Sequence, residues 1–179
     1  MLEFIEDIVK IAKKLKCKTI LDLGCGNCYV TSEMSKQFTM CGVELGTEEI
    51  RIAKTIYPCV VELDMRNALN NFRENSFDAV MTLDSLEHLS KNDSITLLKD
   101  CEKMAKKCVF HFTPINALSE EFAKFRYEQI TKGLISFEEF QGGLRAHRSQ
   151  WLEEEFKEIG YVTKMYKRPY NHVLAIKEL

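Results

Sequence analysis

Hydrophobic residues along the chain follow two patterns: in some segments they recur at helical spacing, and in others they form short continuous runs. In residues 2–15 the apolar side chains recur at helical spacing and lysines gather at the end, which predicts a helix. The run 19–23 is apolar, is followed by a glycine and predicts a buried strand. Another helix begins at Thr47, which we interpret as its N-cap because two acids follow it. The same two patterns predict further strands at 40–44, 59–63, 77–83, 107–112, 161–167 and 171–176, and further helices at 29–37, 90–106 and 149–159.

This alternation of strands and helices predicts one α/β domain over residues 1–179, with a mostly parallel sheet and helices on both of its faces. The closing strands around Pro169 predict an antiparallel end to the sheet. Residues 115–148 depart from the alternation, with helical spacing, several aromatic residues and a glycine pair. We interpret this segment as an insertion or lid over an acceptor pocket. Parallel sheets bind ligands at the carboxyl ends of their strands, so the residues just after each strand are the candidates for a site.

The composition is that of an ordinary globular protein, with 45% hydrophobic and 29% charged residues. The formal net charge is −2 and both signs are mixed along the chain, so there is no electrostatic case for a nucleic-acid partner. No apolar run approaches the ~18 residues that a membrane span needs. The acidic N-terminus has no features of a signal peptide. We therefore expect a protein without a membrane partner.

The chain has seven cysteines, an odd number, and most lie in apolar, strand-like runs. That pattern is typical of buried, reduced thiols and favours a cytoplasmic location. Cys25 and Cys28 form one CxxC pair, but the sequence has no second pair to complete a four-thiolate zinc site. The leading interpretation therefore includes no metal ligands.

A glycine loop joins the first predicted strand to the residues that follow it. Gly24 and Gly26, on either side of Cys25, allow a tight turn and let a ligand lie against bare backbone. A dinucleotide-binding loop would need a third glycine at the position that Tyr29 occupies, which disfavours a nicotinamide-dependent oxidoreductase. The loop by itself does not separate S-adenosylmethionine from NAD.

Carboxylates stand at the ends of three consecutive predicted strands. Asp22 comes just before the loop. Glu44 ends the second strand, where a carboxylate can accept two hydrogen bonds from a ribose diol, and Leu45 follows it. Asp64 ends the third strand and could accept from the exocyclic amine of adenine, while the backbone beside it, at Met65, contacts the ring. Three such acids together indicate a ligand site.

This pattern resembles the class I S-adenosylmethionine-dependent methyltransferases, and the resemblance covers nearly the whole chain. Asp22, Gly24 and Gly26 match the acid and the first glycines of the family's first motif, while Cys28 replaces its third glycine. The family's ribose-binding acid corresponds to Glu44 and its adenine-contacting acid to Asp64. The string 83–89, Leu-Asp-Ser-Leu-Glu-His-Leu, is a common variant in the family.

The resemblance implies a Rossmann-like sheet of seven strands with an antiparallel last strand. It also implies S-adenosylmethionine as the cofactor and S-adenosylhomocysteine as the product. The residues that it places against this cofactor are Asp22, Gly24, Cys25, Gly26, Glu44, Leu45, Asp64, Met65 and Leu83.

Methyl transfer from a sulfonium is an in-line displacement, so the protein mainly aligns the acceptor and excludes water. A general base is needed only if the acceptor's proton must leave early. Asp84 is the first candidate for the reaction face because it should emerge at the tip of the fourth strand. His88 and His147 are the other catalytic candidates, and Glu87 is either a further candidate or an acid at a helix start. The function we expect is methylation of an O or N atom of a small or medium-sized acceptor.

Two alternatives remain open. Asp84, Glu87 and His88, with the distant His147, resemble the Glu-x-x-Glu-His plus histidine metal site of the small-RNA 3′-terminal 2′-O-methyltransferases. Such a set could hold Mg²⁺ or Mn²⁺ and polarise a sugar hydroxyl, although an aspartate replaces the first glutamate and the chain has no basic surplus. The other alternative is a regulatory module that binds the cofactor without turnover.

Overall fold

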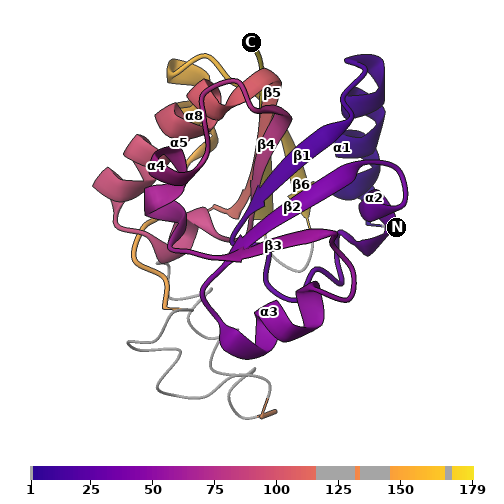
Figure 1. The fold of residues 1–179 in the computed structure, drawn as a ribbon. Helices are drawn as coiled ribbons and strands as arrows, with labels where there is room; N and C mark the ends of the chain where they lie inside the picture. The colour runs from indigo at the N-terminus through magenta and orange to yellow at the C-terminus, as the bar shows by residue number, and fades with distance from the viewer. Residues whose placement is uncertain (1, 116–131, 134–145, 168–170) are drawn as a thin grey trace.

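The computed structural model describes residues 2–115, 132–133, 146–167 and 171–179. They form a seven-stranded sheet in the order β3-β2-β1-β4-β5-β7-β6 (Figure 1). All neighbouring pairs are parallel except β5 with β7 and β7 with β6, so β7 alone runs against the others. The strands are β1 (Thr19–Leu23), β2 (Thr39–Glu44), β3 (Cys59–Glu62), β4 (Phe77–Leu83), β5 (Ala105–Pro114), β6 (Val162–Lys167) and β7 (Asn171–Glu178).

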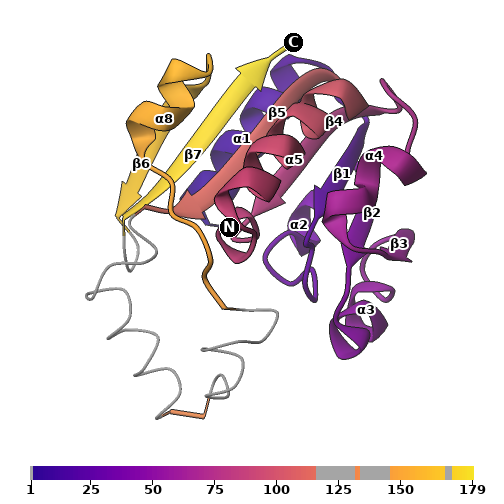
Figure 2. The ribbon, with the colours of Figure 1, turned by 90° about the vertical axis from the view of Figure 1, so that its left-hand side faces the viewer.

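Helices cover both faces of the sheet, as Figures 1 and 2 show from two directions. On one face lie α1 (Glu3–Lys14), α2 (Ser32–Ser35) and α3 (Thr47–Ala53), and on the other lie α4 (Ala68–Asn71), α5 (Lys91–Met104) and α8 (Glu153–Glu158). Two short 3-10 helices, Met65–Asn67 and Leu86–His88, follow β3 and β4.

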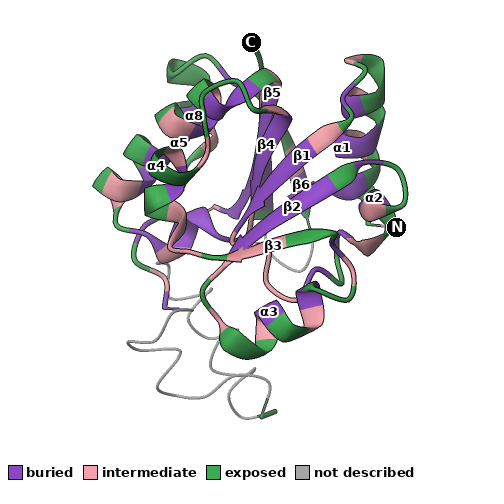
Figure 3. Ribbon diagram, in the orientation of Figure 1, coloured by how far each residue is buried: buried purple, intermediate pink, exposed green. Residues whose placement is uncertain are grey.

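Side chains that alternate along the central strands build a separate core on each face. In β1, Ile20 packs with the helices of one face, while Leu21 packs with those of the other. Ala79 and Val80 of β4 divide in the same way. Figure 3 shows the result, a sheet whose central strands are buried along most of their length. Continuous apolar runs are therefore required in these strands, because both faces are removed from water.

The expected fold class is confirmed: the sheet is Rossmann-like and mostly parallel, and the last strand of the chain, β7, is antiparallel to its neighbours β5 and β6. Strand β1 lies between β2 and β4, so the order of the strands along the chain reverses at β1. This reversal opens a crevice at the carboxyl ends of the neighbouring strands, which is where open α/β sheets bind ligands. No helix in the described part of the chain is long and apolar enough to cross a membrane.

Three local predictions were wrong. Helix 29–37 is reduced to α2, because Cys28 adopts a left-handed φ of 60° and turns precede Ser32. Helix 149–159 is reduced to α8, since Trp151 still forms a β-bridge with Ile115. Thr47 is the first residue of α3 and Gly46 is its N-cap. The predicted lid at 115–148 lies mostly outside the described residues and stays a prediction.

Candidate cofactor and acceptor site

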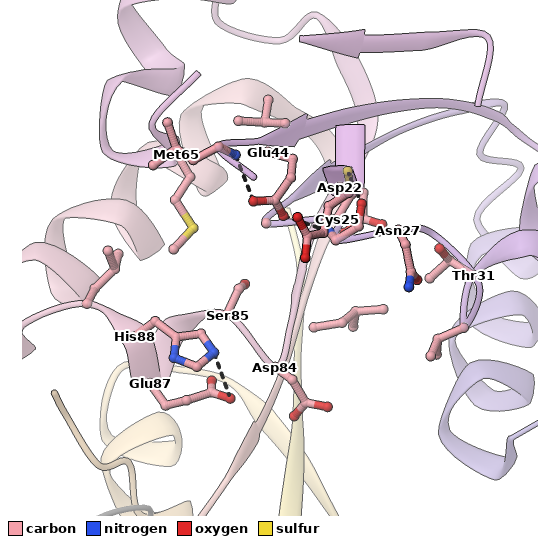
Figure 4. A pocket seen from close by; sticks show the side chains of 18 of the residues that line it. Asp22, Cys25, Asn27, Thr31, Glu44, Met65, Asp84, Ser85, Glu87 and His88 are labelled. Carbon is pink, nitrogen blue, oxygen red and sulfur yellow. Dashed lines mark hydrogen bonds and ion pairs between the residues drawn. The ribbon is translucent and has the colours of Figure 1, made fainter. Parts of the chain in front are cut away.

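A cavity of about 620 Å³ lies where β1, β2, β3 and β4 end. This size is within the range of small-molecule sites. Figure 4 shows the acids of the first strands on one side of an open space and the residues after β4 on the other. All twelve residues that the sequence predicted for the site line the cavity: Asp22, Gly24, Cys25, Gly26, Glu44, Leu45, Asp64, Met65, Leu83, Asp84, His88 and His147.

The glycine loop is fixed to β2 by its backbone. The N–H groups of Gly24 and Cys25 both donate to the carbonyl of Val43, at 2.8 and 3.1 Å. Gly24 has a φ of +74°, and a Cβ there would lie 2.6 Å from the Cβ of Ser85. Only glycine combines this left-handed backbone with so close an approach. Gly26 is also left-handed, but a Cβ there would meet no atom within 4 Å, so the loop presents bare backbone to open space.

Glu44 ties the glycine loop to the residues after β2. Its Oε2 accepts from the N–H of Gly26 at 2.8 Å. Its Oε1 accepts from the N–H groups of Leu45 at 2.7 Å and Gly46 at 3.0 Å (Figure 4). A carboxylate has about four acceptor positions, so this acid can hold the loop and still accept from a ligand.

Asp22 lies beneath the loop and is 1% exposed. Its Oδ2 accepts from the hydroxyl of Tyr57 at 2.8 Å, while its Oδ1 is buried without a hydrogen-bond partner among the described residues. Burial raises the pKa of Asp22 to about 7, and the nearby charge of Glu44 adds to the effect. The Tyr57 hydroxyl, which also contacts the hydroxyl of Thr31, opposes the rise. A buried acceptor that has no partner can accept a hydrogen bond from a donor group of a bound ligand.

Asp64 is engaged by its own neighbour. Its carboxylate accepts from the backbone N–H of Arg66 at 2.9 Å, and so caps the 3-10 helix Met65–Asn67. The Arg66 guanidinium also pairs with both carboxylate oxygens and holds the pKa of Asp64 below its usual value. Capping is thus one role of this acid, and its contact with adenine stays a prediction.

On the opposite side of the cavity, Asp84 follows β4 with a left-handed φ of 49°. This conformation is strained for a residue other than glycine and is often found at functional sites. The N–H of Asp84 donates to the carbonyl of Phe112 at 2.8 Å, which fixes its backbone to β5. The Nε2 of His172, from β7, lies 3.4 Å from its Oδ1.

Glu87, His88 and His147 form a cluster whose possible ligand atoms all lie within 4.8 Å of one another. Glu87 is 2% exposed and accepts from the hydroxyl of Thr113 at 2.9 Å, so it is no solvated acid at a helix start. Burial, together with the nearby charge of Asp84, raises the pKa of Glu87 to about 8. The Nδ1 of His88 lies 3.3 Å from the carbonyl of residue 146, and its Nε2 lies 4.0 Å from Glu87.

Some residues of the site had no signal in the sequence. Tyr57 lies in the connection between α3 and β3, and His172 lies near the start of β7, so neither follows a parallel strand as the predicted residues do. A search restricted to the carboxyl ends of parallel strands therefore cannot find these two residues. Other lining residues that the sequence did not single out include Thr31, Ser85, Arg66 and Arg148.

The fold is that of the Rossmann-like S-adenosylmethionine-dependent methyltransferases. Residues 20–108 match a family model described as a methyltransferase domain, and the chain is recognised as an enzyme of this class. A search of curated proteins found no significant match.

Solved structures of similar fold cover nearly the whole chain. A SAM-dependent methyltransferase from Archaeoglobus fulgidus is 16% identical with a TM-score of 0.67, over 98% of this chain and 94% of that one. Magnesium protoporphyrin IX methyltransferase from Synechocystis PCC 6803 is 14% identical with a TM-score of 0.66, over 98% and 82%. The methyltransferase domain of bacterial CtHen1-CN is 18% identical with a TM-score of 0.63, over 98% and 97%. At these identities the similarity shows the fold.

Proposed function

We propose that this enzyme transfers the methyl group of S-adenosylmethionine to an O or N atom of a small or medium-sized acceptor. The observation that carries the proposal is the gathering of all twelve predicted residues around one cavity. The Synechocystis magnesium protoporphyrin IX methyltransferase, of similar fold, was solved with S-adenosylmethionine and with S-adenosylhomocysteine, which supports the same cofactor here. The product would be S-adenosylhomocysteine.

The residues beside β1, β2 and β3 fit this cofactor. The open space in front of Gly26 admits a ligand against the backbone, and Oδ1 of Asp22 is buried with no hydrogen-bond partner in the described part of the chain. Glu44 has acceptor capacity left for ribose hydroxyls, and Asp64 lies further along the same rim. Leu45, Met65 and Leu83 supply apolar contacts along the cavity wall.

When it is bound, the sulfonium supplies an activated methyl group. What the chain must add is alignment of the acceptor and, for an O–H or N–H group, a place for the proton. Asp84 and His88 lie across the cavity from Asp22 and Glu44 (Figure 4), and His147 also lines the cavity. Glu87 lies beside Asp84, His88 and His147, and its raised pKa of about 8 allows it to exchange protons near neutral pH. Seven free cysteines support the proposed cytoplasmic location.

Two measurements test the proposal. Isothermal titration calorimetry with S-adenosylmethionine and NAD should show binding of the first alone; binding of NAD alone would refute it. Release of S-adenosylhomocysteine is then followed with a panel of low-molecular-weight amines, alcohols and phenols. Turnover with any of them separates an enzyme from a module that binds the cofactor without turnover.

A second candidate is metal-assisted 2′-O-methylation of an RNA 3′ end, and the cluster of Glu87, His88 and His147 favours it. The contact of His88 Nδ1 with a backbone carbonyl leaves Nε2 as the ligand nitrogen, a common arrangement around metals. The probe is an RNA oligonucleotide with a free 3′-terminal diol, compared with the same oligonucleotide ending in a 2′-deoxynucleotide. Methylation of the first alone, lost in EDTA and restored by Mn²⁺, would support this candidate. Full activity in EDTA would remove it.

A further inference from the structure

His172 was not among the residues predicted for the site, yet it contacts the first catalytic candidate. Its Nε2 lies 3.4 Å from Oδ1 of Asp84, at ion-pair distance. The two side chains differ in exposure: that of His172 is 10% exposed and that of Asp84 is 54% exposed. A buried imidazole therefore stands behind a carboxylate that faces the cavity.

The imidazole of His172 is held by aromatic packing. It stacks on the ring of Phe112, with centroids 4.9 Å apart and an interplanar angle of 12°. Phe112 in turn stacks on Phe4 of α1, with centroids 3.9 Å apart. Side chains locked by packing hold their polar atoms in place, which is what a preorganised site requires.

Both partners are attached to the same residue of β5. The backbone N–H of Asp84 donates to the carbonyl of Phe112, and His172 stacks on its ring. The strained φ of Asp84 is thus maintained by β5 while β7 supplies the imidazole. Phe112 therefore contacts both partners, the backbone of Asp84 and the ring of His172.

Electrostatic interactions also connect the pair to Glu87. Burial and the nearby charge of Asp84 raise the pKa of Glu87. His172 is close enough to Glu87 to oppose this effect. The imidazole of His172 therefore lies within electrostatic range of both carboxyl groups.

We infer that His172 is a positioning residue that holds Asp84 as the proton acceptor for the methyl acceptor. The inference rests on the proposed function. As the new bond between methyl carbon and O or N forms, the bond from sulfur to methyl carbon breaks and its electron pair stays on sulfur. The proton of the acceptor's O–H or N–H group passes to the Asp84 carboxylate. His172 fixes the orientation and charge of that carboxylate and touches none of the reacting atoms.

Matched variants separate this role from packing. His172→Phe keeps a ring to stack on Phe112 but has no N–H, while His172→Gln keeps a donor near the position of Nε2. The assay uses the panel compound that the wild type methylates fastest. With it, His172→Phe should lower kcat about tenfold and leave the cofactor Kd and the Tm unchanged. Losing a residue that orients a metal ligand costs about 10- to 100-fold, which sets the scale for this positioning role. His172→Gln should recover part of the lost kcat. In an Asp84→Asn background, His172→Phe should cause no further decrease in kcat. An unchanged kcat, or equal losses in both backgrounds, would overturn the inference.

A second readout needs no acceptor. Titration of the His172 imidazole by NMR should give a lower pKa in Asp84→Asn than in the wild type, because a carboxylate favours the imidazolium. Among the described residues, the titratable groups near the ring include Asp84, Glu87 and, in the register of β6, Tyr166. An unchanged pKa of the His172 imidazole would refute its pairing with Asp84. If no panel compound is methylated, this measurement alone tests the inference. If the wild type binds no S-adenosylmethionine, the proposed function is refuted, whatever the pKa of His172. Failure of the proposed function and failure of the His172–Asp84 pairing can therefore be told apart.

Discussion

Replacing Gly24 and Gly26 separately tests whether the loop is a cofactor cradle or only a turn. Gly24→Ala places a Cβ 2.6 Å from the Cβ of Ser85, on a backbone with a φ of +74°. A left-handed φ costs about 1–2 kcal/mol for alanine, and overpacking adds about 1–3 kcal/mol. Gly26→Ala also has a left-handed φ but meets no atom within 4 Å, so only the first cost applies.

These costs predict different losses of stability. For a domain of this size each 1 kcal/mol lowers the Tm by about 2–4 °C. Gly24→Ala should therefore lower the Tm by roughly 4–20 °C and Gly26→Ala by roughly 2–8 °C. Differential scanning fluorimetry without ligand measures both.

Cofactor affinity decides the function of the loop. If S-adenosylmethionine lies against this backbone, Gly26→Ala should weaken its binding far more than its small loss of stability implies, because the new methyl group points into the space the ligand needs. We expect a loss of at least about tenfold, equivalent to ~1.4 kcal/mol, in calorimetry at a temperature where the variant is folded. Unchanged affinity in a folded Gly26→Ala variant would refute the reasoning and reduce the loop to a turn.

The remaining predictions concern three acids of the site. Tyr57→Phe removes the donor to buried Asp22 and should destabilise the fold by about 1–3 kcal/mol, measured by urea unfolding. Because the pKa of Asp22 rises on folding to about 7, its burial costs nothing below its unfolded pKa of 3.8 and lowers stability progressively from there to about pH 7. Asp22→Asn should flatten that part of the stability profile, and an equally steep decline in the variant would count against the assignment. Asp64→Ala removes a cap worth about 1 kcal/mol and should weaken S-adenosylmethionine binding markedly in calorimetry; Asp64→Asn, which retains an acceptor for the cap, is its control. Asp84→Ala should leave cofactor affinity intact and lower turnover about 100-fold or more, and a variant with full turnover would exclude Asp84 as the proton acceptor.

The agreement between sequence and structure is strongest in the strands and weakest in the short helices. All seven strands were predicted. The central ones are visible because a strand buried on both faces must be continuously apolar. The helices at 29–37 and 149–159 were predicted too long, since helical spacing does not reveal a turn such as that at Cys28. Short apolar segments satisfy both patterns, and tertiary contacts decide between them.

The sequence alone determined the glycine loop and the acids that follow the parallel strands. Gly24, Glu44 and Asp64 could be located because the end of each such strand is visible as the end of an apolar run. Parallel strands bring those ends to one edge, so residues far apart in sequence become neighbours by topology.

Only the tertiary structure decided which groups surround those acids. Tyr57 reaches Asp22 from the connection between α3 and β3, and His172 reaches Asp84 from the antiparallel strand β7. It also showed that Glu87 is buried rather than solvated. Such contacts depend on how strands and helices pack, and no local pattern of residues encodes them. The physical reason is that burial and pairing, which set the charge and pKa of each group, are properties of the folded chain.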